Sequence, residues 1–217
     1  HHLSAKALQH FSHRLRLRST QNWLRQLPKT MSRLVKEMGN PESLSRALSP
    51  IASLSEVVAQ STEQLLPMIM QLQQDLVTNE RDQQHSRFVG GIVPESIRDS
   101  AGLLSRQFTQ LFSHLDSASE VLKEAISDPL VGIPREAAER WYPTVGRALA
   151  RAEGGLALWQ DYAARVSPGD TPKARWLTAI ESAEGGDVEL ACSPIVASEM
   201  LKAHLWDVCA GAVVTSA

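Results

Sequence analysis

Apolar residues recur every seven positions over most of this chain, and this repeat constrains the fold more than any other feature. The longest series consists of Leu44, Ile51, Val58, Leu65 and Leu72, with Leu48, Ile69 and Leu76 four places after members of it. Seven residues are close to two turns of an α-helix, so the series forms one apolar stripe along a helix. We expect a long helix that begins near Pro41 and is kinked or broken at Pro50, at Pro67 or at both.

Two further stripes follow. The first comprises Ile97, Leu104, Leu111, Ala118 and Ala125, joined by Ala101, Phe108, Leu115 and Leu122. The second comprises Ala138, Trp141, Val145, Leu149, Ala152, Leu156, Trp159 and Ala163. Pro134 opens this second stripe, and we expect Pro143 to split off its first turns. A shorter amphipathic segment from Gln21 to Met38 contains Pro28. Together these segments predict a long antiparallel helical bundle, with the striped residues as its core.

Other patterns separate the helical part from the two ends. The longest linker, Asn79 to Val93, is polar and contains Gly90-Gly91, so we expect a mobile loop. Apolar and charged residues alternate over Arg14–Arg18, and Arg175–Ile180 and Val188–Ser193 flank a glycine turn. These three segments predict a small antiparallel sheet at the base of the bundle that brings the chain ends together. The sequence thus divides into residues 1–18, a helical bundle over 19–166, and a returning segment over 167–217.

The last part of the chain favours a different kind of structure. Val196 to Val208 has the pattern of an amphipathic helix, and Ala212-Val213-Val214-Thr215 is a short apolar run that suits a buried parallel strand. A buried parallel strand needs neighbours on both sides, and this sequence offers few. We therefore expect the sequence to be an internal piece of a larger protein, with this terminal strand belonging to another domain.

Composition excludes several kinds of chemistry. Apolar residues make up 43% of the chain, an ordinary fraction for a globular protein, and no apolar run approaches the roughly 20 residues that cross a bilayer. Cys192 and Cys209 are the only cysteines, too few for a disulfide framework or a four-cysteine metal site, and we expect a reducing, cytoplasmic setting. His10 and His13 have too few companions for a metal. Cys192, in a predicted strand, is expected to be buried rather than reactive.

Charge is distributed unevenly. From His1 to Glu37 there are eight lysines and arginines and one acid, whereas the rest carries fourteen against twenty-three acids. Proteins bind single-stranded nucleic acid by placing cations on phosphates and aromatic rings under bases. Residues of these types near one another make the binding candidates Arg14, Arg16, Arg18, Trp23, Arg25, Arg140, Tyr142 and Arg175. The alternatives are a solvated basic helix face, a core position for Trp141, and a sheet position for Trp176.

Both ends of the chain carry helicase-like motifs. The tail GAVVTSA resembles helicase motif III, and the preceding DVELACSPIVASEMLKAHLWDVCA is similar to the strand and helix before that motif in the DinG family of iron–sulfur DNA helicases. The Thr-Leu that commonly follows motif III is absent. At the start, HHLSAKAL resembles the residues that complete a DEGHH-type motif II, although His1 and His2 are also compatible with a purification tag.

The resemblance implies a place within a larger enzyme. In this family the segment between motifs II and III is the arch, which frames the path of single-stranded DNA in a 5′ to 3′ helicase of DNA repair or replication. Thr215 and Ser216 would couple motif III to motif II near His2. The parent would use ATP, Mg²⁺ and a 4Fe-4S cluster. This sequence contains no G-x-x-x-x-G-K-[ST] to bind the ATP phosphates, and its two cysteines are too few for the cluster.

The resemblance also implies partners: the remainder of the motor, and single-stranded DNA bound weakly by this segment alone, with no membrane. The alternative reading of the same helical stripes is a free-standing helical bundle that binds a protein partner. The unaccompanied terminal strand favours the first reading, because an interaction bundle has no need of it.

Overall fold

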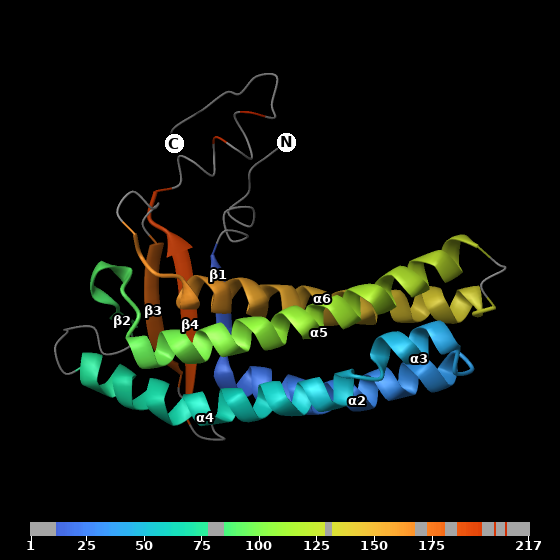
Figure 1. Ribbon diagram of the computed structural model, residues 1–217, viewed down its shortest axis with the longest axis horizontal. Coiled ribbons are helices and arrows are strands. Elements are labelled where there is room, and N and C mark those ends of the chain that lie inside the picture. The colour runs from blue at the N-terminus through green and yellow to red at the C-terminus, as the bar shows by residue number, and fades with distance from the viewer. Residues whose placement is uncertain are drawn as a thin grey trace.

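The computed structural model describes residues 12–77, 85–128, 132–167, 173–180 and 186–196, together with Lys202 and Asp207. Within this part the chain is mainly helical, and one small antiparallel sheet lies near one end of the elongated bundle (Figure 1). The predicted class, a helical bundle with a small sheet at its base, is confirmed to this extent. The strand predicted over Ala212–Thr215 lies outside the described residues, as does nearly all of the helix predicted from Val196 to Val208.

Five helices make up the bundle in the described part of the chain. They are α2 (Leu17–Glu37), α3 (Glu42–Leu48), α4 (Ile51–Val77), α5 (Glu95–Ser127) and α6 (Arg135–Ala163). The predicted stripes face one another, so that Leu65, Phe108 and Trp159 are at most 2% exposed. Helices α5 and α6 pack along their lengths, with α2 and α4 beneath them (Figure 1). The seven-residue repeat therefore predicted the core correctly.

Proline interrupts the helices at one of the predicted places. Helix α3 ends at Leu48 and α4 begins at Ile51, so the break predicted at Pro50 is confirmed. Pro67 lies inside α4 and Pro143 inside α6 without ending either helix. Both prolines are exposed, so the carbonyl that each leaves without an N–H donor lies on the solvent side of its helix.

The sheet contains the three predicted strands. They are β1 (His13–Arg16), β3 (Lys173–Ile180) and β4 (Asp187–Pro194), and a further strand, β2 (His85–Arg87), completes the order β1-β4-β3-β2. Strand β4 pairs antiparallel with both neighbours, which sets His13 opposite Cys192 and Lys173 opposite Pro194. The first strand ends earlier than predicted, because Arg18 already belongs to the first turn of α2.

The second half of the predicted mobile loop is part of the folded body, which corrects that prediction. It contains β2 and the 3-10 turn η1 (Val89–Gly91), and Phe88 and Val93 are 7% and 4% exposed. Gly91 has a φ of +69° and lies so close to β3 that a Cβ would meet the Lys173 carbonyl oxygen at 2.2 Å. Only glycine fits this approach. Residues 78–84 lie outside the described part.

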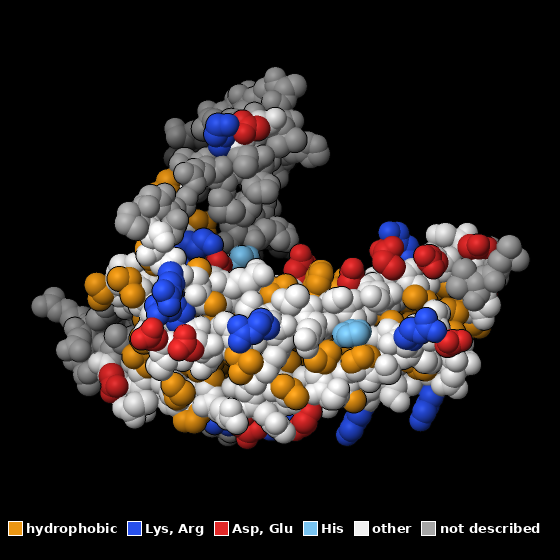
Figure 2. All heavy atoms as spheres, viewed as in Figure 1, with side chains coloured by type: hydrophobic (Ala, Val, Ile, Leu, Met, Phe, Trp, Pro, Cys, Tyr) orange, Lys and Arg blue, Asp and Glu red, His pale blue; other side chains and the backbone are white. Residues whose placement is uncertain are grey.

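The bundle surface carries charges of both signs. Acidic and basic side chains are spread along the face in Figure 2, with hydrophobic side chains between them. Among the described helices, none has an apolar stretch long enough to cross a membrane.

Candidate nucleic-acid interface

Strand β1 presents two arginines on its exposed face. The alternation of the strand turns Leu15 into the core, at 8% exposure, and leaves the Arg14 and Arg16 side chains 60% and 56% exposed. Arg14 Nη1 and Arg16 Nε lie 3.6 and 3.5 Å from the same carboxylate, that of Glu189 on β4. Two guanidinium groups around one carboxylate leave a net positive charge on this face.

Arg18 continues this positive face at the start of α2. Its backbone N–H donates to Asp187 Oδ1 at 3.0 Å, and Asp187 Oδ1 also accepts the Val188 N–H at 2.8 Å. Helix α2 has no side-chain cap from its own N-terminal residue, so Asp187 supplies the cap from β4. The Arg18 guanidinium lies within 4.0 Å of no carboxylate in the described ranges.

Arg151 of α6 joins the same surface, and sequence reasoning missed it. Its guanidinium donates to the Ser19 carbonyl oxygen at 2.8 Å and to Ser19 Oγ at 3.0 Å, and lies 5.0 Å above the Trp23 ring. Burial lowers the pKa of the Arg151 guanidinium below its ordinary value. The sequence pattern that could have indicated this contact is Gly154-Gly155, one turn after Arg151, because small residues let α6 approach its neighbours closely.

These arginines line two adjoining hollows that share Arg16 and Ser19, and we call the pair the basic groove. The larger hollow, of about 530 Å³, is lined by Arg16, Arg18, Ser19, Gln21, Asn22, Arg25, Glu63, Leu66, Ile180 and Asp187. The smaller, of about 270 Å³, is lined by Arg14, Leu15, Arg16, Ser19, Thr20, Ala150, Arg151, Gly154 and Gly155. Five arginines thus face three carboxylates: Glu189, which Arg14 and Arg16 share, Asp187, and Glu63, which pairs with Arg25 at 2.9 Å. The groove can attract an anion.

Two of the predicted binding residues, Arg140 and Tyr142 of α6, lie near the C-terminal end of α2. Arg140 Nη2 is 3.2 Å from Glu37 Oε2, which also accepts the Trp141 Nε1–H at 2.7 Å. Hydrogen bonds from Arg33 and Trp141, with the charges of Arg33 and Arg140, hold the pKa of Glu37 below its usual range. Tyr142 is 37% exposed. Since α2 rises about 1.5 Å per residue, this group is roughly 30 Å from the basic groove.

Arg175 is not a surface residue, which corrects its inclusion among the binding candidates. It is 4% exposed, and its guanidinium donates to two backbone carbonyls, from Nε to Asp161 at 2.9 Å and from Nη1 to Gly91 at 2.7 Å. The side chain therefore ties β3 to α6 and to η1. Trp176, its neighbour, is partly buried in the sheet with the Arg14 guanidinium 5.9 Å from its ring, and Trp141 is 8% exposed on its stripe.

A buried carboxylate holds the base of the bundle together. Asp161 of α6 is 8% exposed, accepts a hydrogen bond from His13 Nδ1 at 2.8 Å, and forms an ion pair with Lys173. Burial raises the pKa of Asp161, but the hydrogen bonds and charges of His13 and Lys173 outweigh burial and hold that pKa below its usual range. The cluster joins β1, β3 and α6 at one point.

The sulfur and metal chemistry of this region is limited. Cys192 is 1% exposed, so its predicted burial is confirmed, and burial together with the Asp161 charge raises the pKa of its thiol to about 12. In the ranges that the structure covers, no three His, Cys, Asp or Glu side chains are grouped so as to hold a metal ion.

The proposed helicase motifs cannot be placed, because His1, His2, Thr215 and Ser216 lie outside the described residues. No model of a known protein family matches this chain. No curated protein matches it either.

Proposed function

We propose that this chain is the arch region of a DinG-type, ATP-dependent 5′ to 3′ DNA helicase, and that its basic groove borders the path of single-stranded DNA. The parent would work in the cytoplasm in DNA repair or replication. ATP, Mg²⁺ and the 4Fe-4S cluster would be held by the rest of that protein. The resemblance of both chain ends to helicase motifs II and III is the starting point of this proposal.

The pairing of β1 with β4 is the observation that carries it. The first and last described strands are antiparallel neighbours, so the chain enters the body opposite the point where it leaves, at His13 and Cys192. An inserted domain needs this arrangement, because the host strands that it interrupts stay close together in space. A helical body closed by its own end strands supports the reading as an insertion.

The basic groove favours contact with phosphates over contact with bases. Its arginines come from β1, α2 and α6, and Arg151 already covers one face of the Trp23 ring. A base could stack on that face of Trp23 only after displacing Arg151. We therefore expect binding that depends strongly on salt and weakly on base sequence.

Salt-titrated binding of a fluorescent single-stranded oligonucleotide tests this part of the proposal. We expect weak binding that falls steeply between roughly 50 and 200 mM salt. The triple variant Arg14→Ala, Arg16→Ala, Arg18→Ala should bind at least about tenfold more weakly at low salt. Its slope of log affinity against log salt should be smaller by about 2, since each lost phosphate contact to a single strand removes about 0.7.

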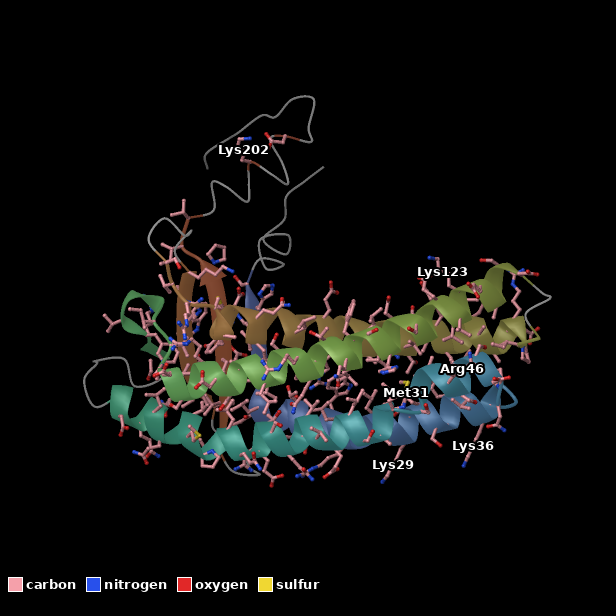
Figure 3. All side chains as sticks on the ribbon, viewed as in Figure 1. Lys29, Met31, Lys36, Arg46, Lys123 and Lys202 are labelled. Carbon is pink, nitrogen blue, oxygen red and sulfur yellow. The ribbon has the colours of Figure 1, made fainter. Side chains whose placement is uncertain are left out.

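Lys123→Ala is the control for this experiment. Lys123 is near the far end of α5 from the sheet, where it pairs with Glu120 at 3.2 Å (Figure 3). It should bind DNA like the parent chain, and thermal unfolding should show that the triple variant is folded. Binding that ignores salt, or a folded triple variant that binds like the parent chain, contradicts the DNA path proposed here.

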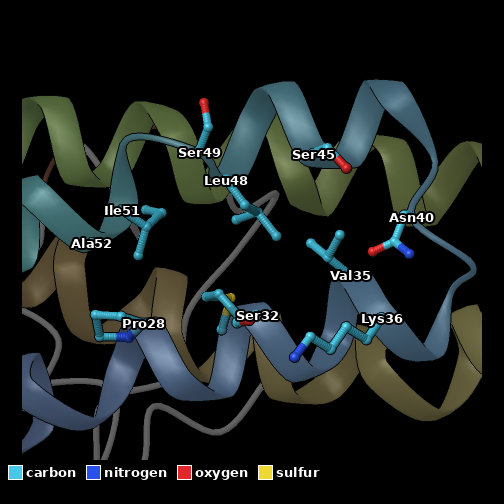
Figure 4. A pocket seen from close by; sticks show the side chains of 11 residues that line it. Pro28, Ser32, Val35, Lys36, Asn40, Ser45, Leu48, Ser49, Ile51 and Ala52 are labelled. Atoms are coloured by element: carbon cyan, nitrogen blue, oxygen red, sulfur yellow. The ribbon is translucent and has the colours of Figure 1, made fainter.

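One observation favours the second candidate, a protein-interaction module. A mainly apolar hollow of about 280 Å³ lies between α2 and the α3–α4 junction, with Val35, Leu48 and Ile51 inside and Lys36 and Asn40 at its rim (Figure 4). Such a hollow suits one apolar side chain of a partner. This candidate predicts no salt-dependent DNA binding, so the oligonucleotide titration separates the two.

A further inference from the structure

Two side chains that line the larger hollow of the basic groove carry N–H donors without acceptors. Gln21 is 7% exposed, and its Nε2 has no hydrogen-bond partner within the described residues. The same holds for Nε of Arg18, three residues earlier on α2. Buried donors are nearly always paired in native proteins, because an unpaired one loses the free energy of its hydration. Both orphans are donors, so a ligand that is rich in acceptors would pair with them.

The charges around the hollow make that ligand an anion. Arg25 is paired with Glu63 at 2.9 Å, and Asp187 Oδ1 is occupied by two backbone N–H groups. The Arg18 guanidinium has no such carboxylate partner in the part of the chain that the structure covers. It lies in the first turn of α2, a helix of 21 residues with no acid in that turn, so the helix dipole adds positive potential at the same place.

We propose that the larger hollow is an oxyanion site that takes one phosphate group, with Arg18 and Gln21 donating to its oxygens. Phosphate matches the donors because each of its oxygens accepts several hydrogen bonds and carries negative charge. The volume of about 530 Å³ exceeds that of a phosphate, which leaves room for an attached sugar. Neither orphan nitrogen is open to solvent, so each side chain must rotate toward the bound oxygens.

The inference rests on the proposed function only for the source of the phosphate. On that function the group is a backbone phosphate of single-stranded DNA; without it, the same site would take a small phosphorylated molecule. Both sources present the same oxygens to Arg18 and Gln21, and competition between inorganic phosphate and an oligonucleotide distinguishes them.

Binding of inorganic phosphate to the whole chain tests the site. Thermal unfolding and amide NMR spectra are followed as phosphate is added, with sodium chloride at equal ionic strength as the reference. We expect a saturable rise in the unfolding temperature, since a ligand that binds only the folded state stabilises it. The resonances of Gln21 and of the first turn of α2 should shift along the same binding curve.

Substitutions at Gln21 make the result specific. Gln21→Glu replaces the orphan donor by a carboxylate oxygen and should weaken phosphate binding at least about tenfold. Gln21→Met removes the donor without adding charge. It should leave stability in chloride unchanged or higher, because no unpaired N–H remains, and should remove the gain from phosphate. Gln26→Glu is the matched control, since Gln26 is exposed on the same helix and does not line the hollow.

The possible outcomes separate the site from the wider function. If an oligonucleotide displaces phosphate, both proposals are supported. If phosphate binds through Gln21 but the oligonucleotide does not displace it, the oxyanion site stands and the DNA path is wrong. Phosphate that acts no differently from chloride, or folded Gln21 variants that gain as much from phosphate as the parent chain, overturns the site.

Discussion

At the scale of single residues, the face of a strand decides whether a charged side chain can bind a ligand. Arg14 and Arg16 alternate with Leu15, and that alternation predicted their exposure correctly. Arg175 is also next to an aromatic residue, but its side chain is buried, and the carbonyls of Asp161 in α6 and Gly91 in η1 accept its donors. Local sequence does not reveal which face of this strand is covered. Arg151 was missed for a related reason, since its role depends on the contact between α6 and α2.

Asp161 gives a prediction at this scale. Asp161→Asn removes the carboxylate that accepts from His13 and pairs with Lys173, and should cost about 2 kcal/mol of unfolding free energy at pH 7. Folding lowers the pKa of Asp161, so its contribution is present above its unfolded value of 3.8 and is lost as the pH falls through the folded value. Urea unfolding at pH 7 and at decreasing pH below 4 should show the difference between parent and variant shrinking with acid.

Glu153→Gln provides the control for that comparison, because Glu153 is exposed on the same helix. It should change stability little at any of these pH values. A cost of Asp161→Asn that stays constant into strong acid would mean that the ionised carboxylate is not the stabilising form.

At the scale of elements, long periodic segments were predictable and short pairings were not. In a long amphipathic helix the apolar residues recur with the helical period over many turns. The stripes of α4, α5 and α6 therefore identified both the helices and their buried faces. Strand β2 has three residues and forms because β3 offers an open edge, which no local pattern records. The prolines inside α2, α4 and α6 show the same limit, since neighbouring turns and packing decide whether a proline ends a helix.

Two adjacent glycines in α6 should respond to alanine with opposite signs. A Cβ on Gly155 would lie 2.4 Å from Cε1 of Phe108, so Gly155→Ala must displace a fully buried ring and should destabilise the bundle by about 2 kcal/mol. A Cβ on Gly154 meets nothing within 4 Å, so Gly154→Ala should stabilise the helix by about 0.5 to 1 kcal/mol. Chemical denaturation of both variants checks this. Equal effects would show that α5 and α6 do not pack in this register.

At the scale of the whole molecule, the sheet closes the body and determines where the chain enters and leaves it. The strands that flank the helices in sequence were predicted to pair, and β1 and β4 do so. Most of the motif resemblance that motivated the helicase proposal falls on residues outside the described part, and only its strand, Asp187–Pro194, is seen, as β4.

The proposal predicts no ATP hydrolysis by this chain alone, because the sequence has no glycine-rich phosphate loop with its lysine. Phosphate release measured with a purified preparation should equal that of the buffer. Turnover above this background that EDTA abolishes would contradict the assignment of the chain to an arch.

Removal of the segment from the proposed parent helicase decides whether it acts as an arch. Because His13 and Cys192 are opposite each other in the sheet, roughly 5 Å apart at Cα, a short glycine–serine linker can replace residues 14–191 without separating the flanking chain. ATP hydrolysis and duplex unwinding are then measured on the shortened protein. If the segment is an arch, basal ATP hydrolysis is retained and unwinding is lost. A shortened protein that still unwinds DNA, or a parent that hydrolyses no ATP, would contradict the arch assignment.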